Sequence, residues 1–435
     1  MRIRWSLSLL LAAVVPAQQE SESPPTRPAP VPADAKAGPR TFAEFPVPDV
    51  PPLDVDQVTK EAIAVLLALQ EGEGHDQWPY QGVYREDRSP SPVGYRVGGT
   101  SIACLGLLAA PGLRDDAPRR EALDRGLRFV LKTLDADRMQ IDFIGQYDVR
   151  GWGHVYALQL LLSLQEARLV PPDLAQVVET KTAWLVQALV ESAIPQSGGW
   201  NYSRPKGYLS PGNTASTFMT APALQALFHA KVLGHTVPDQ VVTQALDALE
   251  RARTKAAGYA YGAPARSRNE VPDEKLSMMD KLPSAAARAA VCEVTLLLAG
   301  RGDPQRLEAA VDLFFAHWDD LAVRKSQTGT HIPPYGIAPY YFLFGHVYAA
   351  QAIEFVADSK RREDLRTKLR AVLAKSREGD GSWNDRQFGR SGGYGTALAL
   401  LTVHMPNVPK PAKWSPSGGA PVEAKGGEAK GGEAK

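Results

Sequence analysis

The sequence predicts an all-α protein whose fold is an (α/α)6 toroid of six outer-inner helix pairs. The first observation is a weak internal repeat in which, six times, a turn rich in Gly, Trp and Tyr leads into an apolar helix. Residues 153–157 and 345–349 are the clearest copies, because both read Gly-His-Val-Tyr-Ala. The second observation is that these apolar helices alternate with amphipathic ones. The copies lie roughly 50 to 70 residues apart, which is typical of helical repeats built from one supersecondary unit each.

Aligning the copies on their final alanine extends the repeat to the other units. The alanine column then holds Ala103, Ala157, Ala223, Ala349 and Ala397, and Val294 stands in once. A second column holds Gln159, Gln225 and Gln351. Recurrence in register, without a Pro/Ser-rich break, indicates one repeat domain rather than two ordinary ones.

The N-terminus has the pattern of a secretory signal peptide over residues 1–17. Arg2 and Arg4 precede an apolar run at 5–15, and small residues follow at the expected cleavage point. Such a segment is too short to span a membrane in the mature protein, so we expect an exported, periplasmic or extracellular protein without a transmembrane segment. The alternative is an uncleaved N-terminal anchor. No cysteine stands at the cleavage point, so a lipid anchor is not indicated.

Two polar segments flank the predicted toroid, which we place at residues 53–407. Residues 18–52 are rich in Pro, Ala, Ser and Glu, and residues 408–435 end in repeats of Gly-Gly-Glu-Ala-Lys. Both contain too few large apolar groups to offset the entropy of ordering, so we expect a disordered linker and a disordered tail. Lys and Arg number 49 and Asp and Glu 48, for a net charge of +1. This balance does not suggest nucleic acid as a partner.

Six amphipathic segments of helical period are predicted to form the outer helices. In the first, Ile63, Leu66 and Leu67 share one face, while Asp56 and Lys60 lie toward water. The predicted outer helices are residues 55–70, 119–134, 174–190, 239–253, 305–318 and 362–375. Helical faces of this kind cover a core on one side and meet solvent on the other.

The second helix of each pair carries few charges and many small residues, and a helix that is apolar all round is buried on all sides. The predicted inner helices are residues 102–109, 155–164, 221–230, 291–299, 348–356 and 396–403. Six such helices inside six amphipathic ones can bury all of their apolar faces by closing into a ring. An open solenoid is the alternative, but it needs polar capping repeats, and the last inner helix is as apolar as the middle ones. Long loops at 72–99, 195–213 and 256–282 should gather at one end of the ring.

Three further motifs give the repeat a family resemblance. Residues 196–200 read Gln-Ser-Gly-Gly-Trp, residues 379–383 read Gly-Asp-Gly-Ser-Trp, and residues 213–217 read Asn-Thr-Ala-Ser-Thr and lead into an Ala-Leu-Gln-Ala-Leu segment. With these motifs the chain resembles the terpenoid cyclase and protein prenyltransferase toroids, whose members carry prenyltransferase/squalene oxidase repeats. The resemblance covers about residues 53–404 and implies a toroid around a central cavity.

Aromatic residues of the turns are the candidate ligand-binding residues. Their faces would hold an apolar chain, a carbocation or a sugar ring at the cavity. The alternative is structural, because an aromatic that follows a glycine turn wedges between helix pairs and buries a large apolar area. The candidates are Trp200, Tyr202, Tyr261, Tyr335, Tyr340, Trp383 and Tyr394.

The catalytic motifs that the resemblance implies are incomplete. Squalene-type cyclases protonate their substrate with an Asp-any-Asp-Asp string, which the sequence lacks. Protein prenyltransferases bind zinc through Asp, Cys and His; Cys292 and His346 match the last two, but Ala290 takes the place of the aspartate. One His and one Cys do not make a zinc site, so we expect neither a metal nor another cofactor. Cys104 is the other cysteine, and we expect two buried thiols rather than the disulfide that export permits.

Polar residues of the loops and inner-helix starts are the catalytic candidates. His154 and His346 occupy equivalent places, where a histidine is either a general acid or base or a hydrogen-bonded core residue. The loop residues would supply the acid and base of a polysaccharide-cleaving enzyme, with salt bridges or turn caps as the alternative. The candidates are Asp148, Arg150, His154, Arg204, His331, His346, Asp385 and Arg390, and the same loops carry Asp142, Asp280 and Arg288.

These observations leave three functions open. The first is an exported toroid that binds an unknown small molecule, glycan or protein at its cavity, because the cyclase acid motif and the full zinc triad are missing. The second is a polysaccharide lyase or glycoside hydrolase that uses the loop residues at one end of the barrel. The third is an isoprenoid cyclase or transferase, which the resemblance alone implies and which fits poorly with export.

Overall fold

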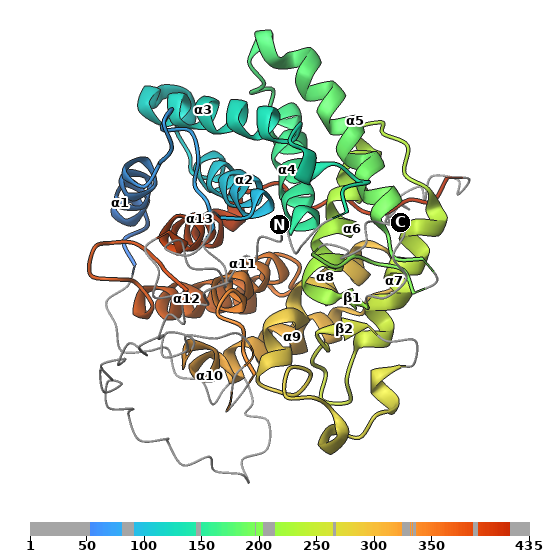
Figure 1. Ribbon diagram of the computed structural model, residues 1–435. Helices are drawn as coiled ribbons and strands as arrows, with labels where there is room; N and C mark the ends of the chain where they lie inside the picture. Colours follow the sequence, from blue (N-terminus) through green and yellow to red (C-terminus); the bar gives the residue numbers. More distant parts are fainter. Residues whose placement is uncertain are drawn as a thin grey trace, which may run out of the picture. The chain divides into compact units, whose positions relative to one another are not determined.

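Six apolar helices form a closed ring at the centre of the fold (Figure 1). The computed structural model describes residues 53–80, 91–144, 149–195, 197–202, 214–263, 267–323, 331, 333, 336–385 and 390–417. The inner helices are α2 (Val93–Ala109), α4 (Arg150–Glu166), α6 (Thr217–Val232), α8 (Ala289–Leu298), α11 (Tyr341–Ile353) and α13 (Ser391–His404). Each packs on the next in this order, and α13 packs back on α2. The predicted closure is therefore confirmed, and the fold is an α/α toroid.

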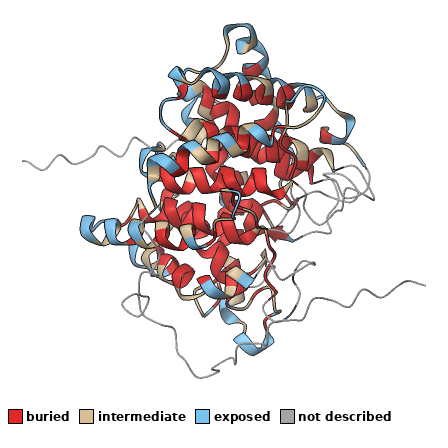
Figure 2. Ribbon diagram, turned by 90° about the vertical axis from the view of Figure 1, so that its left-hand side faces the viewer, coloured by how far each residue is buried: buried red, intermediate tan, exposed pale blue. Residues whose placement is uncertain are grey.

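A second set of helices surrounds the ring, and the outward faces of these helices are exposed to solvent (Figure 2). The outer helices are α1 (Val55–Ala68), α3 (Ala117–Thr133), α5 (Ala175–Ser192), α7 (Asp239–Ala252), α9 (Pro304–Ala316) and α12 (Ser359–Lys375), with the short α10 (Trp318–Ala322) after α9. The first of them, α1, packs on the last inner helix, α13. At this seam the Thr59 hydroxyl lies 2.8 Å from Nε2 of His404. The two ends of the repeat thus hold the ring closed.

Short elements connect the helices. Strand β1 (Ala215–Ser216) pairs antiparallel with β2 (Gly262–Ala263), so that Ser216 lies opposite Gly262. The 3-10 helices are η2 (Leu113–Asp115), η3 (Asp137–Met139), η4 (Pro172–Leu174), η5 (Arg268–Glu270), η6 (Asp273–Lys275), η7 (Ser284–Arg288) and η9 (Met405–Asn407). The β pair joins the loops that precede α6 and α8.

Three tryptophans perform the same structural task in three repeats. Each indole N–H donates to a carbonyl near the end of an outer helix, and each backbone N–H donates to a threonine of an inner helix. For Trp78, Trp200 and Trp383 the carbonyls are those of Leu66, Leu189 and Leu373, at 2.7, 2.7 and 2.9 Å. The threonines are Thr100, Thr220 and Thr396, at 3.0, 3.0 and 3.1 Å. The tryptophans therefore satisfy helix-end carbonyls, which have no partner within their own helix.

The glycines of the repeat serve two different purposes. Gly198 and Gly199 have φ of 73° and 76°, the left-handed turn that glycine adopts without strain. Gly98 and Gly99 instead lie inside α2, which begins at Val93, well before the predicted start. A Cβ atom would come within 2.3 Å of the Trp152 ring at Gly98 and within 2.4 Å of the Trp78 carbonyl oxygen at Gly99. These helical glycines allow close packing, which is why the inner helices extend into segments that read as turns.

The glutamine column of the repeat meets inside the ring. Gln225 and Gln351 form a reciprocal amide pair, with N···O distances of 3.0 and 3.1 Å. Gln225 also donates to the Thr295 hydroxyl at 3.0 Å, and Gln159 donates to the Pro222 carbonyl at 3.2 Å. Buried polar groups are stable only when they are paired in this way. The Gln225–Gln351 pair therefore lies inside the ring at this level.

The segment that follows α13 packs across the far ends of the inner helices. The Trp414 backbone N–H donates to the Leu298 carbonyl at 3.0 Å, and its ring lies 5.3 Å from that of Phe228. Lys231 Nζ lies 4.1 Å from the centre of the same ring. Residues 408–417 thus differ from the solvated tail that the composition predicts, because one tryptophan anchors them. Residues 418–435, like the predicted signal peptide and linker, lie outside the described residues.

Both cysteines are buried with free thiols, as predicted, and burial raises the pKa of each. In the described part of the chain, no helix is both long and apolar enough to cross a membrane. Within the same residues, no three or more His, Cys, Asp and Glu side chains gather as a metal ion would require.

Candidate active site at the tyrosine mouth

Two of the histidine candidates are parts of the helix packing. His154 is 1 % exposed, and its Nε2 lies 2.8 Å from the Met139 carbonyl oxygen. His346 is fully buried, with Nδ1 2.7 Å from the Phe342 carbonyl oxygen and Nε2 accepting from the Trp318 indole at 2.9 Å. Because Nε2 accepts a hydrogen bond, the neutral His346 ring carries its proton on Nδ1. These contacts join inner helices to their neighbours, and the two histidines lie apart from each other.

We predict that the protein loses stability on mild acidification because of His154. Burial lowers its pKa to about 4, whereas a histidine in an unfolded chain titrates near 6.5. Between these values the unfolded chain binds the proton more readily, so stability is complete above pH 6.5 and falls toward pH 4 by about 1.4 kcal/mol per unit. Urea unfolding at about pH 7 and about pH 4.5 measures this slope. His154→Gln should reduce the slope, and a variant with the wild-type slope would contradict the assignment.

Other candidates are also engaged in local contacts. Arg150 donates to the Gln140 and Phe143 carbonyls at 2.6 and 2.7 Å. Arg390 Nε donates to Glu71 at 2.7 Å. Trp200 and Trp383 are the helix-end tryptophans described above, each 1 % exposed. Asp148, Arg204 and Tyr335 lie outside the described residues.

Asp385 and Tyr394 lie in an aromatic layer between the last and first repeats. Asp385 is fully buried and accepts from the Tyr80 hydroxyl at 3.4 Å. The rings of Tyr80 and Tyr394 are 4.5 Å apart. The Tyr394 hydroxyl donates to the Tyr340 carbonyl at 3.3 Å, which connects this layer to the next group.

The structure brings four of the predicted residues together at the N-terminal end of the inner helices. These four are Tyr202, Tyr261, Tyr340 and His331. We call them, together with Tyr341, the tyrosine mouth. The Tyr202 hydroxyl donates to that of Tyr340 at 3.0 Å. The His331 ring centre lies 5.2, 6.5 and 5.8 Å from those of Tyr261, Tyr340 and Tyr341. Tyr261, Tyr340 and His331 are partly exposed, so the mouth reaches the surface.

Local structure holds these side chains in place. The Tyr261 backbone N–H donates to Asp280 at 2.7 Å, and its carbonyl accepts from the Thr217 N–H at 3.1 Å. His331 has φ of 57° and its Nδ1 lies 2.8 Å from the Gly336 carbonyl oxygen. A non-glycine residue in this conformation is strained and persists only where its surroundings require it. Tyr340 and Tyr341 open α11 as its N-cap and first residue.

Arg288 lies beside the mouth, and from the sequence it is one of the polar loop residues outside the set of catalytic candidates. It closes η7 at the start of α8 and is fully buried. Nε and Nη2 donate to the Tyr259 carbonyl at 3.1 and 2.8 Å, and Nη2 donates to the Met279 carbonyl at 2.7 Å. The guanidinium carbon lies 4.7 Å from the centre of the Tyr341 ring. Nη1 is buried without a hydrogen-bond partner.

The charge of Arg288 has no carboxylate partner within 4 Å among the described residues. Asp280, the carboxylate that contacts the mouth, lies 3.8 Å from Arg268. The side chains of Ser216 and Tyr341 are also buried; Ser216 interacts with the Tyr261 hydroxyl, and the Tyr341 hydroxyl interacts with Tyr340 and Arg288.

Burial determines the protonation of the mouth. It raises the pKa of Tyr261, Tyr340 and Tyr341, although the positive charge of Arg288 opposes the shift at Tyr261 and Tyr341. Burial lowers the pKa of His331, and the hydrogen bond to Gly336 opposes that shift. At neutral pH the mouth therefore presents protonated phenols, a neutral imidazole and one buried cation. This set donates hydrogen bonds and attracts an anion.

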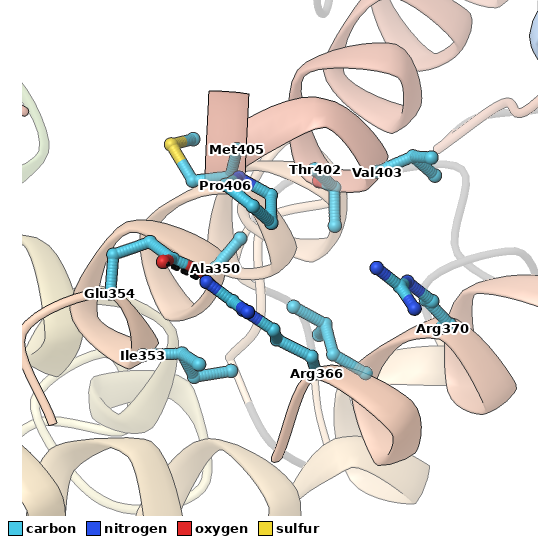
Figure 3. Close-up of a pocket in the computed structure, with 10 residues that line it drawn as sticks. Ala350, Ile353, Glu354, Arg366, Arg370, Thr402, Val403, Met405 and Pro406 are labelled. Atoms are coloured by element: carbon cyan, nitrogen blue, oxygen red, sulfur yellow. Dashed lines mark hydrogen bonds and ion pairs between the residues drawn. The ribbon is translucent and has the colours of Figure 1, made fainter. Parts of the chain in front are cut away.

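The opposite end of the inner helices carries a shallow depression with about 260 Å³ of space, part of it open to solvent (Figure 3). Its lining consists of Ala350, Ile353, Glu354, Arg366, Leu369, Arg370, Thr402, Val403, Met405 and Pro406. Arg366 lies across it and donates to Glu354, with Nε at 2.9 Å (Figure 3). The Arg366 charge is thus paired, unlike that of Arg288.

Comparison with known proteins supports the fold. No protein-family model matches the chain, and no curated protein matches it in sequence. The chain is similar to the Lin0763 protein from Listeria innocua, with a TM-score of 0.51 and 10% identity over 82% of this chain and 98% of that one. It is also similar to an unsaturated glucuronyl hydrolase from Streptococcus agalactiae, with a TM-score of 0.51 and 11% identity over 82% and 93%. At these identities the likeness concerns the fold alone.

A third similarity is to the type II terpene cyclase MstE from Scytonema, with a TM-score of 0.46 and 14% identity over 81% of this chain and 97% of that one. A score at this level supports no argument about function. The comparisons support the fold of the chain and do not assign it to a specific family.

Proposed function

We propose that the mature chain is an exported toroid protein that binds a ligand at the tyrosine mouth. The observation that carries this proposal is the convergence of Tyr202, Tyr261, Tyr340 and His331 from three repeats onto one partly exposed group. Aromatic faces with a few polar groups are typical of ligand sites in proteins. The signal-peptide pattern at residues 1–17 supports export.

Two features favour binding at the mouth over chemistry deep in the ring. The Gln225–Gln351 pair occupies the interior, where an isoprenoid chain would otherwise extend. The sequence also lacks the Asp-any-Asp-Asp acid of squalene-type cyclases. An isoprenoid cyclase or transferase is for these reasons the least supported of the three functions.

An enzyme that cleaves an extracellular polysaccharide is the second candidate. The neutral imidazole of His331 beside the phenols of Tyr261 and Tyr341 would supply such an enzyme with a base and an acid within one group. Hydrolysis of a glycoside ordinarily requires two carboxylates, and Asp280 is held by the Tyr261 N–H and lies near Arg268. The mouth therefore fits elimination better than hydrolysis. Release of an unsaturated product, which absorbs ultraviolet light, would distinguish this candidate from simple binding.

Calorimetric titration of the mature protein with neutral and acidic oligosaccharides and with isoprenoid alcohols and acids tests the proposal. We predict that Tyr261→Phe and Tyr340→Phe weaken binding about 5-fold or more, since each loses about 1 kcal/mol of hydrogen bonding. Arg366→Met, in the far depression, is the matched control and should leave binding unchanged. Loss of binding in the control but not in the tyrosine variants would place the ligand elsewhere.

A further inference from the structure

The segment after the last inner helix, residues 408–417, lies against the C-terminal ends of other inner helices, and we call it the clasp. Lys410 Nζ donates to the carbonyl of Glu354, the C-cap of α11, at 2.8 Å. The Trp414 backbone N–H donates at 3.0 Å to the carbonyl of Leu298, the last residue of α8. Carbonyls at this end of a helix have no partner within the helix, and positive charge is favourable there. The clasp therefore caps α11 and α8.

The clasp also reaches α6 and the start of α7. The Trp414 ring packs on Phe228 of α6, and Lys231 Nζ of the same helix lies 4.1 Å from its centre. Lys231 Nζ donates to the Asp239 carboxylate at 3.0 Å and to the Ser417 hydroxyl at 2.8 Å. The Ser417 backbone N–H donates to Asp239 at 2.8 Å. The clasp thus joins α11, α8 and α6, three consecutive inner helices of the ring.

The clasp has the properties of a segment that docks and releases as a unit. None of its residues is fully buried, and Trp414 is only partly exposed. Segments with few buried apolar groups open before the rest of a fold. Prolines restrict the free segment and so reduce the entropy lost on docking; they are Pro409, Pro411 and Pro416.

The same three helices carry the tyrosine mouth at their opposite ends. Thr217, the first residue of α6, donates its backbone N–H to the Tyr261 carbonyl at 3.1 Å. Arg288, the N-cap of α8, donates to the Tyr259 carbonyl at 2.8 Å. Tyr341 is the first residue of α11. Rigid helices transmit a displacement of one end to the other, so the clasp and the mouth are connected through α6, α8 and α11.

We propose that the clasp is a conformational device that keeps the tyrosine mouth assembled. Docked, it fixes the C-terminal ends of α6, α8 and α11 relative to one another; released, it lets these helices shift and the mouth loosen. The junction of α6 and α8 depends on it most, because the β1–β2 pair joins the loops at one end and Trp414 bridges the helices at the other. For the ligand, the proposal rests on the proposed function.

Hydrogen exchange in the full chain tests the device without a ligand. Trp414→Ala and Lys410→Met should each raise the exchange rate of peptides that contain Thr217 and Tyr261, by about 10-fold for Trp414→Ala. Thr59→Val is the matched control, because it removes the contact of α1 with His404 of α13, and neither helix carries a mouth residue. It should lower the melting temperature and leave exchange at the mouth unchanged. Unchanged exchange in Trp414→Ala, or an equal rise in the control, would overturn the proposal.

A ligand of the mouth supplies a second test, because coupling between two sites is reciprocal. Trp414→Ala should weaken its binding about 5-fold or more, and saturating ligand should slow trypsin cleavage after the exposed Lys413 by a similar factor. Equal affinity in Trp414→Ala and wild type would overturn the coupling and leave the proposed function intact. If no oligosaccharide or isoprenoid binds, the proposed function fails, and the exchange measurement alone decides on the clasp.

Discussion

Trp200→Ala is expected to lower the free energy of unfolding by about 3–5 kcal/mol, the cost of deleting a fully buried tryptophan. Trp200 is 1 % exposed and its indole caps the Leu189 carbonyl at 2.7 Å, so the variant loses packing and leaves a helix-end carbonyl without its partner. Urea unfolding followed by circular dichroism measures the change. Trp383→Ala should cost a similar amount, since it occupies the same position in another repeat.

Trp200→Phe is the control that separates packing from hydrogen bonding. It retains an aromatic ring and should cost less than the alanine variant, by an amount that reflects the larger remaining apolar area. The ligand-binding alternative for Trp200 makes a different prediction. A change below about 1 kcal/mol accompanied by lost ligand binding would show that the ring serves a ligand rather than the helix pair.

Glu293→Gln should have the next largest effect, about 3–5 kcal/mol, because it leaves two arginines near a site that has lost its anion. Glu293 is 1 % exposed and lies 3.1 Å from Arg253 and 3.3 Å from Arg306. Its Oε1 also accepts from the Tyr259 hydroxyl at 2.9 Å. Thermal and urea unfolding of the mature protein both report the loss.

Glu363→Gln is the matched control for Glu293→Gln. The Glu363 side chain is 56 % exposed and lies near Arg366 and Arg370, a pair of surface contacts that should be worth less than about 1 kcal/mol. Equal, small effects of the two substitutions would mean that solvent reaches Glu293 and that its network contributes little.

Most of the fold was predictable because its causes are local in the sequence. Helical periodicity marks the outer helices, and uniform apolarity marks the inner ones. The starts of the inner helices were not predictable in the same way. Gly98 and Gly99 read as turn residues, but their purpose is contact with Trp152 and the Trp78 carbonyl in other elements, which the local pattern does not contain.

The candidate site was predictable only in part. Tyr202, Tyr261, Tyr340 and His331 were candidates because they follow glycine- or proline-rich turns, and the loops that carry them do meet at one end. The importance of Arg288 depends on the carbonyls and rings around it, which come from separate segments. An arginine in a loop does not reveal from sequence whether a carboxylate neutralises it. Asp148, Arg204 and Tyr335 stay predictions.

Trp414 illustrates a different limit of sequence reasoning. The composition after α13 is that of a solvated tail, and a single large aromatic has little weight in such an average. In the folded chain that residue lies against Phe228 and Lys231 of α6, and these contacts with a distant helix make the difference. The composition of a segment contains no information about the helices against which that segment packs.

A crystal structure of the protein with the oligosaccharide or isoprenoid that binds best tests the central claim most directly. We predict the ligand at the tyrosine mouth, with a polar atom about 2.7–3.2 Å from the Tyr261 or the Tyr340 hydroxyl. A ligand seated in the depression beside Arg366, or a tyrosine mouth that holds only water at saturating ligand, would contradict it.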